Sequence, residues 1–180
     1  MMLESIFYRT QQFWNALSAK PGPEDLELVR NLLTPAQMGL FSRMQTSEQV
    51  HSIAVMKRLS LEKDVNSSQH VRSLLEAALL HDVGKSRYPL RLWERVMIVL
   101  AIALFPRKVT EWGSGEISGW QRVFVISEQH PEWSAQMAEG VGTMPLAVEL
   151  IRQHQNHYPA NTVSIEGRLL ERLQIADQNN

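Results

Sequence analysis

Helix start signals recur along this chain of 180 residues, and strand signals are nearly absent. The clearest start is Thr34-Pro35-Ala36-Gln37, where a Thr cap, a Pro at the first helical position and a Gln three residues after the cap reinforce one another. Residues 46–49 repeat the capping-box spacing, and Pro131 and Pro145 each fit a first helical position. The sequence therefore predicts an all-α fold.

Apolar residues at spacings of three and four extend these starts into amphipathic helices. Residues 120–126 are interpreted as helix, although Val123, Val125 and Ile126 suit a strand equally. Residues 111–116 contain a Gly-Ser-Gly sequence and are predicted to form a flexible loop. The expected helices cover residues 3–17, 24–33, 35–44, 46–59, 69–80, 89–104 and 120–126, a segment that begins at Pro131, and residues 145–154 and 163–177.

The length and the hydrophobic content of 44% suffice for one ordinary core, so we expect one compact domain. In it, the helices of residues 1–33 pack on a helical bundle formed by residues 34–180. The formal charge of −1 gives no general reason to bind nucleic acid. Without cysteine, any metal site must use His, Asp and Glu. The start lacks the features of a signal peptide, which favours a cytoplasmic protein.

The most apolar segment, residues 96–105, is far shorter than the ~20 residues that a membrane-spanning helix needs. We interpret it as a buried helix with ordinary core packing and with the flanking arginines reaching out to water. The alternative is that residues 91–108 form an interfacial membrane helix or a partner surface. Trp112 and Trp120, on either side of the Gly-Ser-Gly sequence, are candidates for a lid over a site.

The pair His81-Asp82 is the strongest chemical signal in the chain, and Gly84 and Lys85 follow it closely. Successive residues inside a helix diverge by ~100°, so the pair converges on one ion most easily where the helix ends. Gly84 is then expected to free the backbone at this point. Imidazole and carboxylate together suit first-row divalent metals, and Lys85 offers a positive charge to a phosphate. The pattern predicts a metal site.

A family resemblance rests on the order of the histidines and carboxylates along the chain. It resembles the His…His-Asp…His…His…Asp pattern of HD-domain metal-dependent phosphohydrolases, from about Thr34 to the end. Residues 130–135, His-Pro-Glu-Trp-Ser-Ala, are similar to the His-Pro-Glu-x-Gly motif of the branch that includes HD-GYP phosphodiesterases. Gln-Ile-Ala-Asp at 174–177 is similar to the family's closing motif. The residues that match are His51, His81, Asp82, His130, His154 and Asp177.

The resemblance implies an HD-type helical bundle with two divalent metal ions, of Fe, Mn, Mg, Co, Ni or Zn. One ion would be held by His51, His81, Asp82 and Asp177. The other would be held by Asp82, His130 and His154, with Asp82 as the bridge. Two such ions position and activate a water and polarise a phosphoryl oxygen. Asp82 and Lys85 are therefore the predicted catalytic residues.

The chain departs from HD-GYP enzymes after His154. Those enzymes have His-His-Glu followed by Gly-Tyr-Pro, whereas residues 154–159 here are His-Gln-Asn-His-Tyr-Pro. The second histidine, the acidic residue and the glycine are missing, which disfavours a cyclic dinucleotide substrate. His157 either replaces a ligand or is an ordinary loop residue.

The leading hypothesis is a metal-dependent phosphohydrolase that cleaves a nucleotide or another small phosphoester through a metal-bound hydroxide. Two alternatives remain open at this point. A di-iron oxygenase resembles these hydrolases in fold and uses the same six ligands, and a regulatory binding module would keep the metal without turnover. The substrate is the expected partner, no nucleic acid is expected, and the sequence does not fix the oligomeric state.

Overall fold

The computed structural model describes residues 20–61, 68–156 and 164–179, and all regular structure in these ranges is helical. The prediction of an all-α fold is therefore confirmed. The helix predicted for residues 3–17 and the candidate His157 lie outside the described residues. The elements are α2 (Pro23–Leu32), α3 (Pro35–Phe41), α4 (Thr46–Ser60), α5 (Ser68–Leu80), η1 (Val83–Arg87), α6 (Leu92–Leu104), α7 (Pro106–Gly113), η2 (Gly119–Gln121), α8 (Arg122–Glu139), α9 (Pro145–Gln153) and α10 (Ile165–Gln178).

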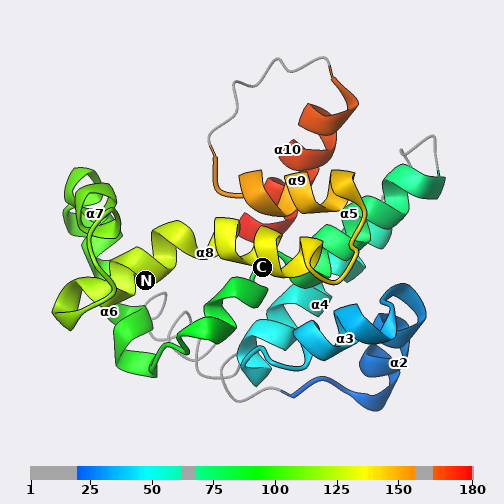
Figure 1. Cartoon of the computed structure of the whole chain (residues 1–180), viewed down its shortest axis with the longest axis horizontal. Coiled ribbons are helices and arrows are strands. Elements are labelled where there is room, and N and C mark those ends of the chain that lie inside the picture. The colour runs from blue at the N-terminus through cyan, green and yellow to red at the C-terminus, as the bar shows by residue number, and fades with distance from the viewer. Residues whose placement is uncertain (1–19, 62–67, 157–163, 180) are drawn as a thin grey trace, which may run out of the picture.

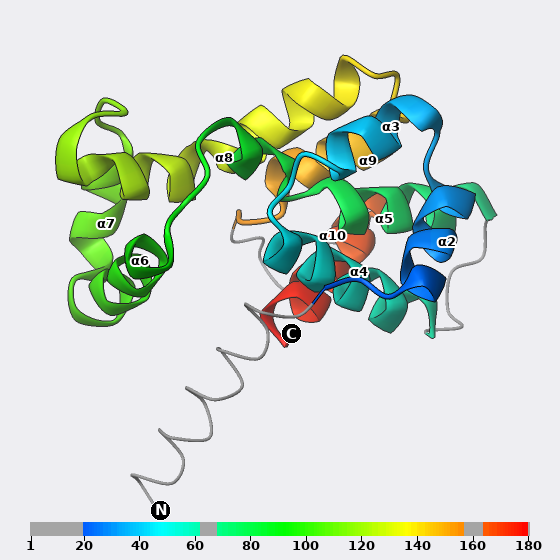
Figure 2. The same cartoon turned by 90° about the horizontal axis from the view of Figure 1, so that it is seen from below.

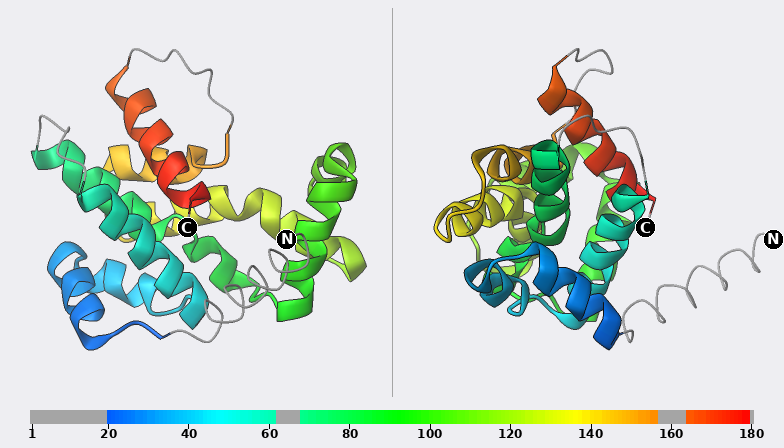
Figure 3. Two further views of the ribbon diagram at one scale, coloured as in Figure 1. Left: turned by 180° about the vertical axis from the view of Figure 1, so that it is seen from behind. Right: turned by 90° about the vertical axis from the view of Figure 1, so that its right-hand side faces the viewer.

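Most helices form a bundle around α5, which packs against α4 on one side and α9 on another (Figure 1). Helix α10 crosses α4 and α9, as Figure 3 shows from behind. The last turn of α5 is apolar on every side, and Ala77, Ala78, Leu79 and Leu80 are all fully buried. A helix that is apolar all round belongs in a core, so α5 carries the residues that follow it into the interior.

Helices α6 and α7 project from this bundle together with the start of α8 (Figure 2). They form a second, smaller hydrophobic cluster, which includes Ala101, Val109 and Phe124. Helix α8 runs through both parts, since its first half packs on α7 and its second half contributes Ala135 and Ala138 to the main core. The molecule thus has a bundle and a projecting arm that share one long helix.

The prediction that a helix begins at Pro131 is wrong, because Pro131 lies inside the continuous helix α8. A proline has no N–H group, so it cannot donate to the carbonyl oxygen of Ser127 one turn earlier. Nδ1 of His130 donates to that oxygen instead, at 2.8 Å. The side chain therefore satisfies the acceptor that the proline leaves without its backbone donor. Residues 120–126, which suited helix or strand equally, are helical: they comprise the end of η2 and the start of α8.

The predicted flexible loop at 111–116 is wrong in its first half, because α7 continues to Gly113. Pro106 does close α6, as expected, but it also occupies the first turn of α7 and so starts a new helix. Two other boundaries differ: α3 ends at Phe41 rather than near 44, and α6 begins at Leu92 rather than Pro89.

The interpretation of residues 96–105 as a buried core helix is wrong. Leu100 and Leu104 on α6 are 55% and 67% exposed, and Phe105 just after the helix is 52% exposed. Among the described residues, those of α7 and the start of α8 pack on one side of α6 only. In the part of the chain that the structure describes, no helix is long and apolar enough to cross a membrane.

Gly84 allows η1 to pack directly against the backbone of α8. Its N–H donates to the hydroxyl of Ser134 at 2.7 Å. A Cβ at this position would lie 2.5 Å from the carbonyl oxygen of His130 and 2.7 Å from the backbone nitrogen of Ser134. Among the described glycines only Gly119 and Gly142 have positive φ, so the expected release of the backbone at Gly84 is not its role. The glycine serves close approach instead.

Replacing Gly84 with Ala is expected to destabilise the protein by about 1–3 kcal/mol, because the added methyl group collides with a helix backbone that cannot give way. Urea unfolding followed by circular dichroism measures the change. Gly39→Ala is the matched control, since a Cβ at Gly39 meets nothing within 4 Å. This second change should be neutral or stabilise α3 by up to about 1 kcal/mol. Equal stability of both variants would contradict the close-packing role.

Candidate metal centre

The six predicted ligands come together at one end of α5, although they are spread over the sequence from 51 to 177. Each sits at a helix end or on a turn that faces this point. The positions are early α4 for His51, directly after α5 for His81 and Asp82, the middle of α8 for His130, directly after α9 for His154, and the last turn of α10 for Asp177.

One side of the centre brings three of these residues together. Nε2 of His51 lies 2.7 Å from Oδ1 of Asp177, and Nε2 of His81 lies 3.5 Å from the same oxygen. One ligand atom from each residue lies within 4.8 Å of the others, a spacing that allows a shared metal ion. This side is partly open to solvent, since about a quarter of the Asp177 side chain is exposed.

The other side of the centre is buried. Oδ1 of Asp82 lies 3.1 Å from Nε2 of His130 and 3.7 Å from Nε2 of His81. Nε2 of His130 is 3.3 Å from Nε2 of His154. His81, Asp82 and His154 form a second group whose ligand atoms fit a shared ion. Both groups contain His81, and the carboxylate of Asp82 lies between two imidazoles.

The three buried histidines are oriented by the same backbone interaction. Nδ1 of His81 donates to the carbonyl of Ala78, and Nδ1 of His154 donates to that of Ile151, at 2.9 and 2.7 Å. His130 uses the Ser127 carbonyl in the same way. A carbonyl oxygen only accepts, so Nδ1 carries a proton in all three rings, and Nε2 is the atom that points into the centre and would bind a metal when the ring is neutral. Such second partners fix the tautomer that a metal needs.

Burial and charge set the protonation of the centre. Burial, together with the neighbouring His81 and His130, lowers the pKa of His154 to about 3. Burial, together with Lys85, also lowers the pKa of His130. Both rings are therefore neutral, as metal ligands must be. The pKa of Asp82 is held well below its usual range, because Lys85 and His81 outweigh the effect of burial.

His81 differs from the other two histidines. Burial lowers its pKa, but the charges of Asp82 and Asp177 outweigh burial and raise the pKa to about 9. Its Nε2 is nevertheless buried without a hydrogen-bond partner, because both carboxylates stand beyond 3.4 Å. A buried polar atom without a partner is rare and points to a ligand. The donor set of imidazoles and carboxylates around this atom fits a divalent metal ion.

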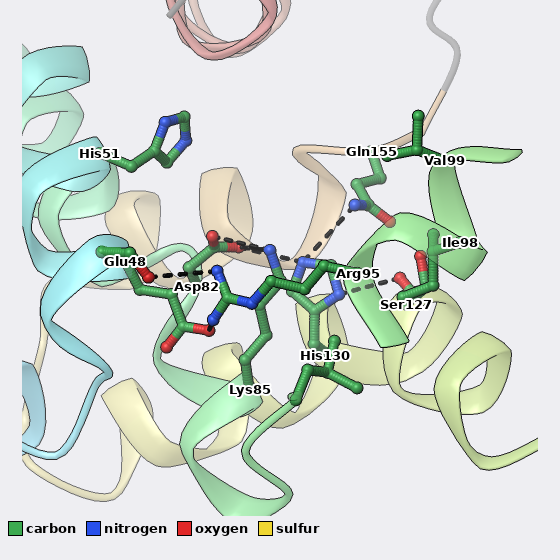
Figure 4. A pocket seen from close by; sticks show the side chains of 12 residues that line it. Glu48, His51, Asp82, Lys85, Arg95, Ile98, Val99, Ser127, His130 and Gln155 are labelled. Atoms are coloured by element: carbon green, nitrogen blue, oxygen red, sulfur yellow. Dashed lines mark hydrogen bonds and ion pairs between the residues drawn. The ribbon is translucent and has the colours of Figure 1, made fainter. Parts of the chain in front are cut away.

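A cavity of about 440 Å³ opens from the metal centre toward α6 (Figure 4). Asp82, His130 and Lys85 form one wall, and Ile98 and Val99 form an apolar wall. Nζ of Lys85 is held 2.7 Å from the carboxylate of Asp82. The volume suits a small ligand. The candidate catalytic residues thus border a space that a substrate can enter.

The sequence did not point to Arg95 and Glu48, which both line this cavity and contact each other directly (Figure 4). Nη2 of Arg95 donates to Oε1 of Glu48 at 2.8 Å, and Nη1 donates to Ser47. Burial raises the pKa of Glu48, and Arg95 opposes this shift. Glu48 stands one helical turn before His51, a spacing that places both on one face and was the available signal. Arg95 was interpreted as a solvent-reaching arginine, but its guanidinium is anchored in the site.

The two tryptophans that were candidates for a lid lie away from the site. Trp112 and Trp120 do not cover the metal centre. Their ring centroids are 5.1 Å apart, and both rings pack near Phe124 on the projecting arm. Gln155 occupies the position after His154, with its amide nitrogen 3.5 Å from Nε2 of His130. It lines the cavity and was not singled out as a site residue.

Comparison with known families agrees with this geometry. Residues 49–178 match the sequence model of the HD domain, and this range contains all six candidate ligands. The chain belongs to the HD-domain family. HD-domain proteins are mostly metal-dependent phosphohydrolases, and their fold is helical. No curated protein and no solved structure matches the chain.

The protonation of His81 predicts how the metal-free protein responds to alkali. Its pKa is about 9 in the fold, against about 6.5 when unfolded. The folded state holds the proton more tightly, so this stabilisation is complete below pH 6.5 and is lost as the pH rises to 9. The Tm of the chelator-treated protein should therefore fall across this window. The lowered pKa of His154 acts at a pH below 6.5, outside it.

Thermal unfolding from pH 6 to 9.5 measures this effect, with His81→Asn as the control. The variant should show a much flatter dependence of Tm on pH over the window. The same decline in Tm with and without His81 would assign the effect to another group and contradict the charge distribution described above.

Proposed function

We propose that this HD-domain protein is a metal-dependent phosphohydrolase that acts on a small phosphoester, with nucleotides among the candidates. The observation that carries the proposal is a cavity lined both by three candidate metal ligands, His51, Asp82 and His130, and by two cationic side chains, Lys85 and Arg95. Metal ligands alone suit many reactions, including oxygenation. Two fixed cations beside them suit an anionic group such as phosphate.

We propose two metal ions in this centre. One would be held by His51, His81, Asp82 and Asp177, and the other by Asp82, His130 and His154. The position of Asp82 between His81 and His130 supports its role as the bridge. When bound, divalent ions supply Lewis-acid polarisation of a phosphoryl oxygen and lower the pKa of bound water.

The protein's own side chains would position the substrate. Lys85, paired with Asp82, presents a compact positive charge at the metal centre. The guanidinium of Arg95 uses bonds to Gln45, Ser47 and Glu48, which leave two of its five N–H donors for a phosphate. The wall formed by Ile98 and Val99 suits the less polar part of the substrate, such as a base or an aryl group. The cavity would thus bind phosphate at one end and an organic group at the other.

The proposal predicts hydrolysis of aryl phosphates or nucleotides by the protein loaded with Mn, Mg, Fe or Co, without a requirement for oxygen. Asp82→Ala should lower kcat/KM roughly 100-fold or more, since even outer-shell changes around metals cost 10–100-fold. Its metal content, measured by mass spectrometry, should fall as well. Glu139→Ala removes an exposed carboxylate from the same helix as His130 and should change neither quantity.

Replacing Arg95 tests phosphate recognition separately from metal binding. Arg95→Met alone would leave Glu48 buried without its cation, so the variant should be paired with Glu48→Gln. We expect KM to rise about tenfold or more with metal content unchanged, because charged hydrogen bonds to the substrate are lost.

Turnover that consumes oxygen would contradict the hydrolase proposal. A metal content and activity that survive Asp82→Ala would also overturn it.

A further inference from the structure

Helix α6 has an exposed apolar surface that no described element covers. From Val96 to Phe105 there is no charged residue, so the helix is apolar on every side. Helices of this kind are expected in a core or in contact with lipid. Here only one side is packed, mainly through Ala101, with Met97 and Ile98 beside it. The remaining apolar surface faces solvent.

The exposed surface extends around more than one face of the helix. Val96, Leu100 and Leu104 follow one another at spacings of four and form one exposed row. Val99 and Ile102, which are 61% and 50% exposed, lie on other faces. A partner helix in a groove would cover one row. Exposed apolar side chains on several faces suit an apolar medium that surrounds the helix.

Exposed aromatic rings extend this surface onto the neighbouring helices. A groove of about 400 Å³ runs along α6 and is bordered by Trp93, Leu100, Phe105 and Trp120. Trp93 and Trp120 are 57% and 58% exposed. The groove lies on the arm that projects away from the bundle, where a flat surface can reach it (Figure 2). Tryptophan is the residue that membrane interfaces favour.

The charges around the apolar run are mostly positive. Residues 91–108 contain four cations and one carboxylate, although the whole chain carries a formal charge of −1. That carboxylate, Glu94, is buried and paired with Arg122. Arg91, Arg107 and Lys108 are exposed at the two ends of α6, and none of them forms an ion pair with another described residue. The free charges of this segment are thus cationic.

We infer that the arm docks on an anionic lipid surface, with α6 lying in the interface rather than crossing it. Apolar side chains on several faces would enter the acyl boundary, and the cations at both ends would meet anionic headgroups. The inference does not depend on the proposed hydrolase activity. It has one consequence for the site, since Val99 belongs both to this exposed run and to the cavity wall. Docking would bring the cavity close to the lipid surface.

Flotation with lipid vesicles tests the inference on the full chain. The wild-type protein should float with vesicles of phosphatidylcholine and phosphatidylglycerol at 3:1, and less with phosphatidylcholine alone or in high salt. Leu100→Glu with Leu104→Glu should weaken binding about tenfold or more, since both side chains lose their transfer from water to lipid. The double variant Leu28→Glu with Leu61→Glu adds the same charge at exposed leucines of the bundle and should float like the wild type.

Two outcomes would overturn the inference. One is a wild-type protein that stays with the soluble fraction at every lipid composition. The other is equal flotation of both double variants, which would place lipid contact elsewhere on the chain. A wild-type dimer that becomes a monomer in the α6 variant, without vesicle binding, falls under the first outcome and would assign the face to a second copy. Circular dichroism of each variant checks that the fold is intact.

Discussion

Burial of the His81-Asp82 pair at the end of α5 is the constraint on which the rest of the structure depends. Ionisable side chains are stable in an interior only when charges and hydrogen bonds compensate them. Here the compensation comes from four other helices, through His51, His130, His154 and Asp177. The packing of α4, α8, α9 and α10 around α5 therefore forms the core and the chemical centre together. A fully apolar last turn of α5 makes this position possible.

Hydrogen bonds to the backbone then determine which ligand atoms point into the centre. Each buried histidine donates a proton from Nδ1 to a carbonyl of its own helix, and this bond turns Nε2 toward the centre. In α8 the donor also compensates for the missing N–H of Pro131. Gly84 brings η1 against the same helix and thereby holds Asp82 and Lys85 next to His130. All six ligands thus lie in a helix or in the turn directly after one.

The all-α fold was predictable because helix-capping signals are local sequence patterns. The six converging side chains were predictable because their order along the chain matches that of the HD-domain family. Other features depend on tertiary contacts, which the local sequence does not show. Pro131 fits a helix start in sequence, and only the neighbouring imidazole makes it compatible with a helix interior. Residues 96–105 have the composition of a core segment, but the described helices of the arm leave most of their side chains exposed. The role of Arg95 depends on Glu48, which is 47 residues away.

The central proposal is that these six side chains would hold two divalent ions, with Asp82 shared by both. Crystals of the protein grown with Mn²⁺, and anomalous diffraction recorded from them, test it most directly. We predict two anomalous peaks, one beside His51 and Asp177 and one beside His130 and His154, with density from both reaching Asp82. A single peak would contradict the two-metal arrangement. No peak within reach of Asp82 would contradict the metal centre itself.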